Sequence, residues 1–366
     1  MKCVSGACVT VASLGLGAYH TCAVMSDGTA RCWGYNPYGQ LGDGTTTDQH
    51  SPEWIVTLGT SVVQIRGGLR HSCAVIADGS VKCWGDNSFG QLGDGTTTRQ
   101  LNPEVVVGLG TGVVSLAIGE AHSCALMKDG SAKCWGLNAG GQLGDGSTTD
   151  RHTPISIPTL GTSVKQLCTG TSHSCAMMSD GSVRCWGDNY SGELGDGTTV
   201  RQTSPEVVTA LGTGVKQVVC GGFHTCALML DNSVRCWGAN FGGQLGDGTV
   251  TDQHTPETIV ALGTTVKQLA AGSGHACAVL SDGSVRCWGS NSKGSVGDGT
   301  TTDRHSPVAI TLLGTGVAQI TLGPADAAHS CALLTDGSVR CWGWNSAGQV
   351  GNGTIVDATS PVTPSW

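Results

Sequence analysis

Residues 71–98 read HSCAVIADGSVKCWGDNSFGQLGDGTTT, and this stretch carries a complete set of strand and turn signals. Alternating apolar positions around an Asp-Gly pair are typical of a β-hairpin, and the glycine-rich end is typical of a loop. The stretch recurs along the chain, as shown by its Cys-Trp-Gly motif, which begins at Cys32, Cys83, Cys134, Cys185, Cys236, Cys287 and Cys341. The first five intervals are 51 residues and the last is 54. Seven copies of one unit therefore fill almost the whole chain, which predicts a repeat architecture.

The first half of each unit is predicted to be a β-hairpin with a three-residue loop. In the second copy this loop is 77–79, and its glycine takes the left-handed position that such loops favour. The fifth copy has Asn232 there, and asparagine is the next most tolerant residue for a positive φ. With this loop Cys73 lies opposite Cys83 in a non-hydrogen-bonded pair, at a Cα separation of roughly 4.5 Å that a disulfide can span.

Each hairpin therefore predicts one disulfide. The expected pairs are Cys22–Cys32, Cys73–Cys83, Cys124–Cys134, Cys175–Cys185, Cys226–Cys236, Cys277–Cys287 and Cys331–Cys341. Two alternatives stay open: metal binding by His-x-Cys with the opposite cysteine, and free buried thiols in a reducing cytosol. Titration of accessible thiols before and after reduction distinguishes these alternatives from the disulfides. Cys3 and Cys8 suit a short local loop, and Cys168 and Cys220 suit a bridge between repeats, but sequence alone does not fix this connectivity. Paired cysteines favour an extracellular, periplasmic or cell-surface location.

The composition indicates a packed, acidic protein. Glycine supplies 58 of 366 residues without the period of collagen, and 39% of residues are hydrophobic, so disorder is excluded. A formal charge of −8 with 19 basic residues gives no electrostatic footprint for nucleic acid. No apolar run is long enough to span a bilayer, so we expect no membrane insertion. Residues 1–10 lack the apolar core of a signal peptide, so any leader is expected outside this sequence.

A unit of this length with four short extended segments is typical of one blade of a β-propeller. We therefore expect a single domain, residues 1–366, with seven blades of about 51 residues. Units two to seven are each preceded by a segment like 51–56, whereas the first unit has none ahead of Val11. The matching segment stands at the other end, as 360–366. We expect this C-terminal segment to complete the first blade and close the ring.

The units resemble the regulator of chromosome condensation (RCC1) repeat family. The resemblance rests on His-Ser/Thr-x-Ala, the Asp-Gly turn, Trp-Gly-x-Asn and Gly-Gln-Leu-Gly-Asp-Gly-Thr, as in 84–96, and it covers all seven units. It implies an all-β, seven-bladed propeller with four strands per blade. Cysteine stands where family members usually carry apolar or small residues. The best-known member is a GTPase exchange factor that docks on chromatin through inserted elements and a basic arm, and neither feature is apparent here. A plant member senses ultraviolet light through tryptophans in a stretch that here, at 68–72, reads GLRHS, so we expect no photochemistry.

Residues that recur in every unit are expected to be structural, because a reactive site needs its base or nucleophile once. We expect the recurrent histidines (His20, His71, His122, His173, His224, His275, His329) to hydrogen-bond within their own blades and the recurrent tryptophans to pack between blades. The aspartates of the Gly-Asp-Gly-Thr turns offer one carboxylate each, too few for calcium, and are predicted to form turns. We expect the basic residue before each Cys-Trp-Gly to pair with one of them. No enzyme activity, metal or cofactor is expected.

Binding is expected where the units differ. Six aromatic residues fall in the loops between Trp-Gly and Gly-Gln-Leu: Tyr35, Tyr38, Phe89, Tyr190, Phe241 and Trp344. Equivalent propeller loops emerge on one side, so these residues predict a broken aromatic ring on one binding face. The alternative is that each ring packs against the glycines of its own loop. The seventh unit also carries an insertion, in which Pro324 and Asp326 mark a candidate contact.

Two functions follow from these features. The first is a non-catalytic, extracytoplasmic binding module that presents the aromatic face to a protein or glycan. The second is a structural subunit that assembles into an oligomer or filament, which light scattering at increasing concentration would reveal. A guanine-nucleotide exchange factor is the third option, and it would accelerate nucleotide release.

Overall fold

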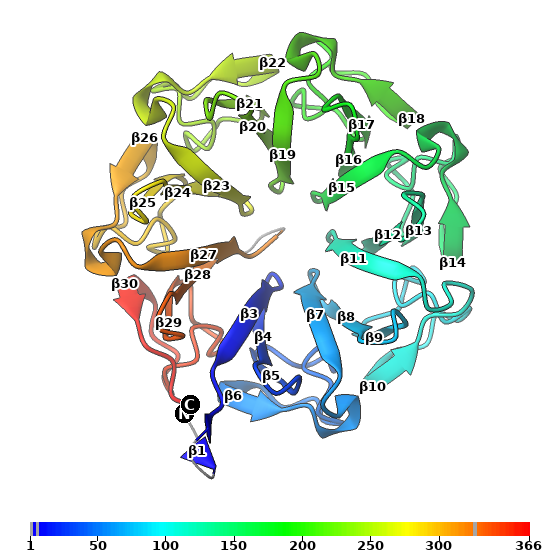
Figure 1. Ribbon diagram of the computed structural model, residues 1–366, viewed down its shortest axis with the longest axis vertical. Coiled ribbons are helices and arrows are strands. Elements are labelled where there is room, and N and C mark those ends of the chain that lie inside the picture. Colours follow the sequence, from blue (N-terminus) through cyan, green and yellow to red (C-terminus); the bar gives the residue numbers. More distant parts are fainter. Residues whose placement is uncertain (1–2, 5–6, 325–327) are drawn as a thin grey trace.

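Seven four-stranded antiparallel sheets are arranged around a central axis as the blades of a propeller (Figure 1). This computed structural model describes the backbone of residues 3–4, 7–324 and 328–366, and the side chains within those ranges from Val9 onward. The predicted all-β fold with seven blades is confirmed. Within each blade the four strands follow one another in sequence from the axis to the rim. No described helix has the length and apolar content needed to cross a membrane.

Each blade contributes one strand to each of four concentric positions. The innermost strands are β3 (Val11–Leu16), β7 (Val62–Gly67), β11 (Val113–Ile118), β15 (Val164–Thr169), β19 (Val215–Cys220), β23 (Val266–Ala271) and β27 (Val317–Leu322). The second strands are β4 (His20–Met25), β8 (His71–Ile76), β12 (His122–Met127), β16 (His173–Met178), β20 (His224–Met229), β24 (His275–Leu280) and β28 (His329–Leu334). The third strands are β5 (Ala30–Gly34), β9 (Val81–Gly85), β13 (Ala132–Gly136), β17 (Val183–Gly187), β21 (Val234–Gly238), β25 (Val285–Gly289) and β29 (Val339–Gly343).

The fourth strands lie at the rim and precede a short helical turn in five blades. They are β6 (Gln49–Trp54), β10 (Gln100–Val105), β14 (Arg151–Ser156), β18 (Gln202–Val207), β22 (Gln253–Thr258), β26 (Arg304–Ala309) and β30 (Ala358–Val362). The 3₁₀ turns are η1 (Val56–Leu58), η2 (Pro158–Leu160), η3 (Thr209–Leu211), η4 (Val260–Leu262) and η5 (Thr311–Leu313). Ahead of the first blade, β1 (Cys3–Val4) pairs with β2 (Ala7–Cys8).

The hairpin between the second and third strands has the predicted geometry. Gly79 has a φ of 82°, and Asn232, its counterpart in the fifth blade, has a φ of 65°. Asn232 is the one residue other than glycine with a positive φ in the described chain. The loop sets Cys73 opposite Cys83, and the same register recurs in the other six blades.

Seven disulfides join the facing cysteines of the hairpins, each with a Cα–Cα separation of 4.1 Å. An eighth disulfide joins Cys168 of β15 to Cys220 of β19, so it links two neighbouring blades near the axis. Cys3 and Cys8 lie opposite each other in β1 and β2, but their side chains lie outside the described residues. No described cysteine side chain carries a free thiol.

The hydrophobic core lies between the blades. At each contact the cysteine pair and the loop leucine or valine of one blade meet the tryptophan of the next, as Leu41 and Trp84 do between the first two blades. The seven recurrent tryptophans are all fully buried. The Trp84 indole N–H donates to the Gln40 carbonyl of the preceding blade at 2.9 Å, and the other six repeat this bond. Packing of the tryptophans between blades is therefore confirmed.

The recurrent histidines form a belt, the histidine belt, that also joins neighbouring blades. His20 Nε2 lies 2.7 Å from Ser72 Oγ of the next blade, and equivalent pairs occur at six of the seven contacts. The Ser72 hydroxyl donates to the Gln40 carbonyl, so it accepts from the histidine, which places the ring proton on Nε2. At the remaining contact Ala276 replaces the hydroxyl residue, and His224 has no such partner. The expected bond within the same blade is wrong, because the ring points across the contact between blades.

The expected pairing of the turn aspartates with the basic residue before Cys-Trp-Gly is also wrong; where such an aspartate has an ionic partner it is an arginine at the start of the fourth strand, as in Asp145–Arg151 and Asp298–Arg304. Asp94 Oδ1 accepts from the N–H and the hydroxyl of Thr96 at 2.8 Å, so the carboxylate is occupied by its own turn. The basic residue before Cys-Trp-Gly bonds elsewhere, as when Lys133 Nζ donates to the Gly108 carbonyl.

The ring closes by side-chain packing between the seventh and first blades, and not by a C-terminal strand added to the first blade as expected. β30 pairs with β29, with Val362 opposite Cys341, so it completes the seventh blade. The C-terminal segment 360–366 therefore does not complete the first blade, because β6 already occupies the rim of that sheet. The end of the segment still reaches the first blade, where the Trp366 ring stands edge-to-face to Trp33 at 5.7 Å.

Candidate functional site

The loops after Trp-Gly are held by a buried asparagine in every blade. In the first blade Asn36 Nδ2 donates to Asp43 Oδ1 and to the Thr45 carbonyl, both at 3.2 Å. Its Oδ1 accepts from the Leu41 N–H at 2.9 Å. The amide thus ties both ends of the loop together, which is the physical basis of the Trp-Gly-x-Asn and Gly-Asp-Gly-Thr motifs. Other side chains on these loops are consequently presented on a fixed backbone.

Four aromatic side chains of the seventh and first blades converge on this loop face. We name them the aromatic patch: Tyr19, Tyr35, Tyr38 and Trp344. The Tyr19 ring lies 5.7 Å from Tyr35 and 5.3 Å from Trp344, edge-to-face in both cases. The rings of Tyr35 and Tyr38 are 6.5 Å apart. All four side chains are partly exposed, so three of the sequence-predicted aromatics meet in one accessible cluster.

Two arginines of the second blade border the aromatic patch. The guanidinium carbon of Arg70 lies 4.6 Å from the centre of the Tyr38 ring, and that of Arg99 lies 5.8 Å from it. Arg99 also donates to the Pro37 carbonyl at 2.7 Å, which ties the second blade to the loop of the first. A cavity of about 260 Å³ opens beside the patch, lined in part by Tyr19, Tyr35, Arg70 and Trp344. The site is therefore aromatic and locally basic.

The other sequence-predicted residues lie apart from the aromatic patch. Phe89, Tyr190 and Phe241 are 39%, 76% and 67% exposed, and they belong to the second, fourth and fifth blades. Pro324 borders the channel along the propeller axis. Asp326 lies outside the described residues. The structure thus gathers half of the six predicted loop aromatics and leaves the others separate.

Three residues near these sites were not predicted: Tyr19, Arg70 and Phe223. Each directly precedes a recurrent histidine. The backbone sets this position beside the residue after Trp-Gly, and the Tyr35 N–H donates to the Tyr19 carbonyl at 2.9 Å. The signal was present in the sequence, because the register that sets the cysteines opposite each other also sets these two positions opposite each other.

One carboxyl group on the loops is buried. Glu193 stands where five blades have glutamine, is 3% exposed, and accepts from the Ser191 N–H at 2.9 Å. Burial raises its pKa to about 7, and the nearby Asp188 carboxylate acts in the same direction. Together with Tyr190 and Phe223 it lines a cavity of about 210 Å³. Its charge therefore changes near neutral pH.

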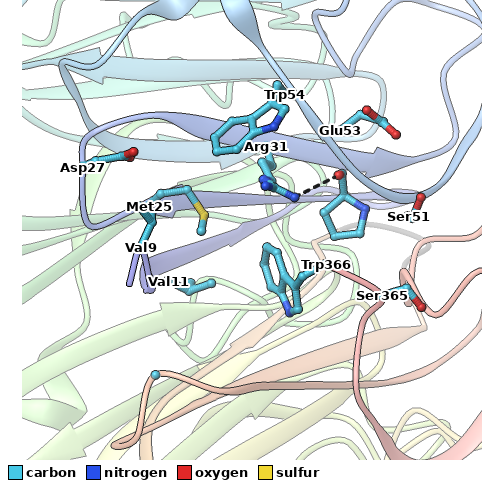
Figure 2. A pocket seen from close by; sticks show the side chains of 12 residues that line it. Val9, Val11, Met25, Asp27, Arg31, Ser51, Glu53, Trp54, Ser365 and Trp366 are labelled. Atoms are coloured by element: carbon cyan, nitrogen blue, oxygen red, sulfur yellow. Dashed lines mark hydrogen bonds between the residues drawn. The ribbon is translucent and has the colours of Figure 1, made fainter. Parts of the chain in front are cut away.

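A larger cavity, of about 530 Å³, lies where the seventh blade meets the first (Figure 2). Arg31 sits between two indoles there, with its guanidinium carbon 3.8 Å from the Trp54 ring centre and 5.8 Å from that of Trp366. Its Nη1 donates to the Pro52 carbonyl at 3.4 Å. The described lining contains no histidine or cysteine. The arrangement explains how the chain end packs on the first blade.

The histidine belt is a poor source of reactive groups. Every ring is at most 1% exposed. Burial lowers the pKa of six rings to about 3 and that of His224 to about 4, so all are neutral at pH 7. The sulfurs of Cys168, Cys175 and Cys220 lie within 4.8 Å of one another, but each belongs to a disulfide. Metal binding needs the thiolate, so these sulfurs are not ligands while they are oxidised.

Comparison with known proteins gives consistent matches over the whole propeller. The family model described as RCC1-like domain matches residues 112–365, and models of the RCC1 repeat match 11–40 with 62–91 and 27–75 with 78–126. The ultraviolet-B receptor UVR8 of Arabidopsis thaliana is 33% identical over 94% of this chain and 79% of the receptor. The E3 ubiquitin-protein ligase HERC2 of Homo sapiens is 32% identical over 90% of this chain, a match that spans 7% of the ligase.

Solved structures agree on the fold. Yeast RCC1 (Prp20), solved with bound Kap60, superimposes with a TM-score of 0.82 at 21% identity and covers 98% of this chain and 85% of that one. At this identity the likeness concerns the fold alone. The RCC1-like domain model covers more than half of the chain, and the match to UVR8 covers most of both proteins. The chain therefore belongs to the regulator of chromosome condensation (RCC1) repeat family.

Proposed function

We propose that this protein is a non-catalytic interaction module that binds a protein partner through the aromatic patch. The observation that carries the proposal is the convergence of four partly exposed aromatic rings from two blades, with Arg70 stacked on Tyr38. Aromatic and arginine side chains are the types most enriched at binding hot spots. These four rings are partly exposed to solvent, and they do not belong to the hydrophobic core, which lies between the blades.

The rigidity of the scaffold supports this role. The patch stands on loops fixed by buried asparagine, on hairpins closed by disulfides. A pre-ordered surface loses less conformational entropy on binding than a mobile one, so more of the contact energy contributes to affinity. A protein of the same fold is known with a protein partner, since yeast RCC1 (Prp20) was solved with Kap60 bound.

We also propose that the protein works in an oxidising compartment. The eight described disulfides are the support, because the cytosol keeps most protein thiols reduced. Alkylation during lysis of the source cells, followed by mass spectrometry, tests this. We expect no alkylated hairpin cysteine before reduction; recovery of the hairpin cysteines as free thiols would contradict the proposal.

Partner capture with matched variants tests the binding face. The bait is the intact, oxidised protein, compared with a Tyr38→Ser/Trp344→Ser variant and with a Tyr190→Ser control that removes a more exposed aromatic side chain from another blade. We expect the purified partner to bind the control within a factor of two of the native protein and the patch variant at least tenfold more weakly. Equal binding by all three proteins would contradict the proposed face.

A further inference from the structure

Arg66 is the one charged side chain among the described residues that line the channel along the propeller axis. It lies in β7, at a strand position where the other six blades have uncharged residues: Gly15, Ala117, Cys168, Val219, Ala270 and Thr321. The channel encloses about 310 Å³. Its other polar lining consists of amide and hydroxyl groups, such as those of Gln64 and Ser115. Among the described lining residues, Arg66 therefore contributes the one charge of the channel.

Arg66 has no carboxylate partner in the described part of the chain. Its Nη1 donates to the carbonyls of Leu14 at 3.3 Å and Ile65 at 3.0 Å, and both acceptors are neutral. Burial lowers the pKa of Arg66, and no acidic group of the described residues opposes the effect, whereas nearby carboxylates oppose it at Arg31. A guanidinium has five N–H donors, so these two bonds leave three without an acceptor among the described residues.

The contact between the first two blades is shaped to admit this side chain. The first blade has Gly15 at the position equivalent to Arg66. A Cβ at Gly15 would lie 2.1 Å from the Ile65 carbonyl oxygen, so any larger residue would force the inner strands apart. The glycine lets the strands approach closely enough for Arg66 to reach the Leu14 carbonyl.

Glutamine side chains fix the wall of the channel. Gln166 donates to the Val218 carbonyl at 2.9 Å and accepts from the Val218 N–H at 3.1 Å, which bridges two inner strands. Gln217 bridges to Leu269 of the next blade in the same way. A wall held by such paired bonds needs little ordering when a ligand binds.

We infer that the axial channel binds a small oxyanion, a carboxylate or a phosphate, at Arg66. The planar fork of a guanidinium matches two oxygens of either group. A partly buried charge without a counter-charge is costly, and a bound anion would supply that counter-charge. This site is independent of the aromatic patch, so its failure would leave the proposed protein binding intact.

Thermal unfolding at constant ionic strength tests the site, with chloride replaced stepwise by phosphate in one arm and by acetate in the other. Native protein is compared with Arg66→Gln and with Lys267→Gln, which removes one positive charge from an exposed surface position. At an anion concentration one hundred times the Kd, the folding equilibrium constant rises about a hundredfold. We expect a saturable rise in Tm for the native protein and Lys267→Gln, and none for Arg66→Gln. The arm that responds identifies the anion chemistry. An equal rise in Arg66→Gln, or no saturable rise in the native protein, would overturn the inference.

Two further measurements keep the test decisive. If Arg66→Gln does not fold, the Arg66 Nε–Hε signal of the native protein is followed by NMR during the same titrations, and a signal that stays in place overturns the inference. The titrations are repeated with Asp326→Asn, because Asp326 is a carboxylate of the insertion after Pro324. If only the Asp326→Asn variant binds the added anion, the Asp326 carboxylate itself occupies the site in the native protein. That result would overturn the inference that the site takes an external anion.

Discussion

Acidification from pH 7 to pH 5 is expected to destabilise the folded protein through the histidine belt. Burial holds the pKa of the seven rings at about 3, or about 4 for His224, below the ordinary value of 6.5. Between these values the unfolded chain binds protons that the folded chain does not. The stabilising contribution is therefore complete above pH 6.5 and is lost as the pH falls toward the folded pKa values.

The magnitude follows from the number of rings and the width of the interval. Each pH unit below 6.5 costs about 1.4 kcal/mol per histidine, so each ring loses about 2 kcal/mol between pH 7 and pH 5. Seven rings together give at most on the order of 10 kcal/mol, which is comparable with the whole stability of an ordinary domain. The hairpin disulfides leave this loss in place, because they constrain the unfolded chain without changing the protonation of its histidines.

Urea unfolding followed by tryptophan fluorescence at several pH values measures this loss. The buried tryptophans report on the same contacts between blades as the histidine belt. We expect His71→Gln to lower the pH dependence by about one seventh when it folds, and His254→Gln, at an exposed histidine, to leave it unchanged. An unfolding free energy that stays constant from pH 7 to pH 5, or NMR titration of the belt histidines near pH 6.5 in the folded protein, would refute the reasoning.

Three further substitutions test individual contacts, each by urea unfolding at pH 7.5. Ala276→Ser should stabilise the protein by about 1 kcal/mol, because it supplies the hydroxyl that His224 lacks; no gain would show that the ring is already satisfied. Gly42→Ala should cost about 2–5 kcal/mol, since φ is 72° and the new Cβ would lie 2.6 Å from an indole nitrogen of the next blade. Its control, Gly108→Ala, has a φ of 81° with nothing within 4 Å and should cost about 1–2 kcal/mol; equal costs would dismiss the steric argument. Trp366→Ala should cost about 2–3 kcal/mol by opening the packing on the first blade, and an unchanged midpoint would mean that the chain end plays no part in closure.

The hairpins could be predicted because the forces that shape them are local. A three-residue loop with glycine in the left-handed region admits one register, and that register sets Cys73 opposite Cys83. Asn232 satisfies the same requirement with a φ of 65°. Even Tyr19 could have been placed beside Tyr35, since the two residues occupy opposed positions of one hairpin.

The aromatic face was predicted in part. Loop positions on one side of a propeller follow from the repeat, and Tyr35, Tyr38 and Trp344 do meet. They meet because Tyr19 fills the space between two blades, a contact that depends on how closely the seventh blade approaches the first. Phe89 has no such neighbour and stands apart.

The repeat, the register of the hairpins and their seven cysteine pairs are consequences of short-range geometry, and the amino-acid sequence was enough to derive them. The contacts between blades were settled by the folded ring: the next-blade partner of His20, the bridge from Cys168 to Cys220, and the place of Trp366. These contacts join residues some fifty or several hundred positions apart. Their geometry depends on the distance and tilt of whole sheets, which no turn preference or hydrophobic period specifies.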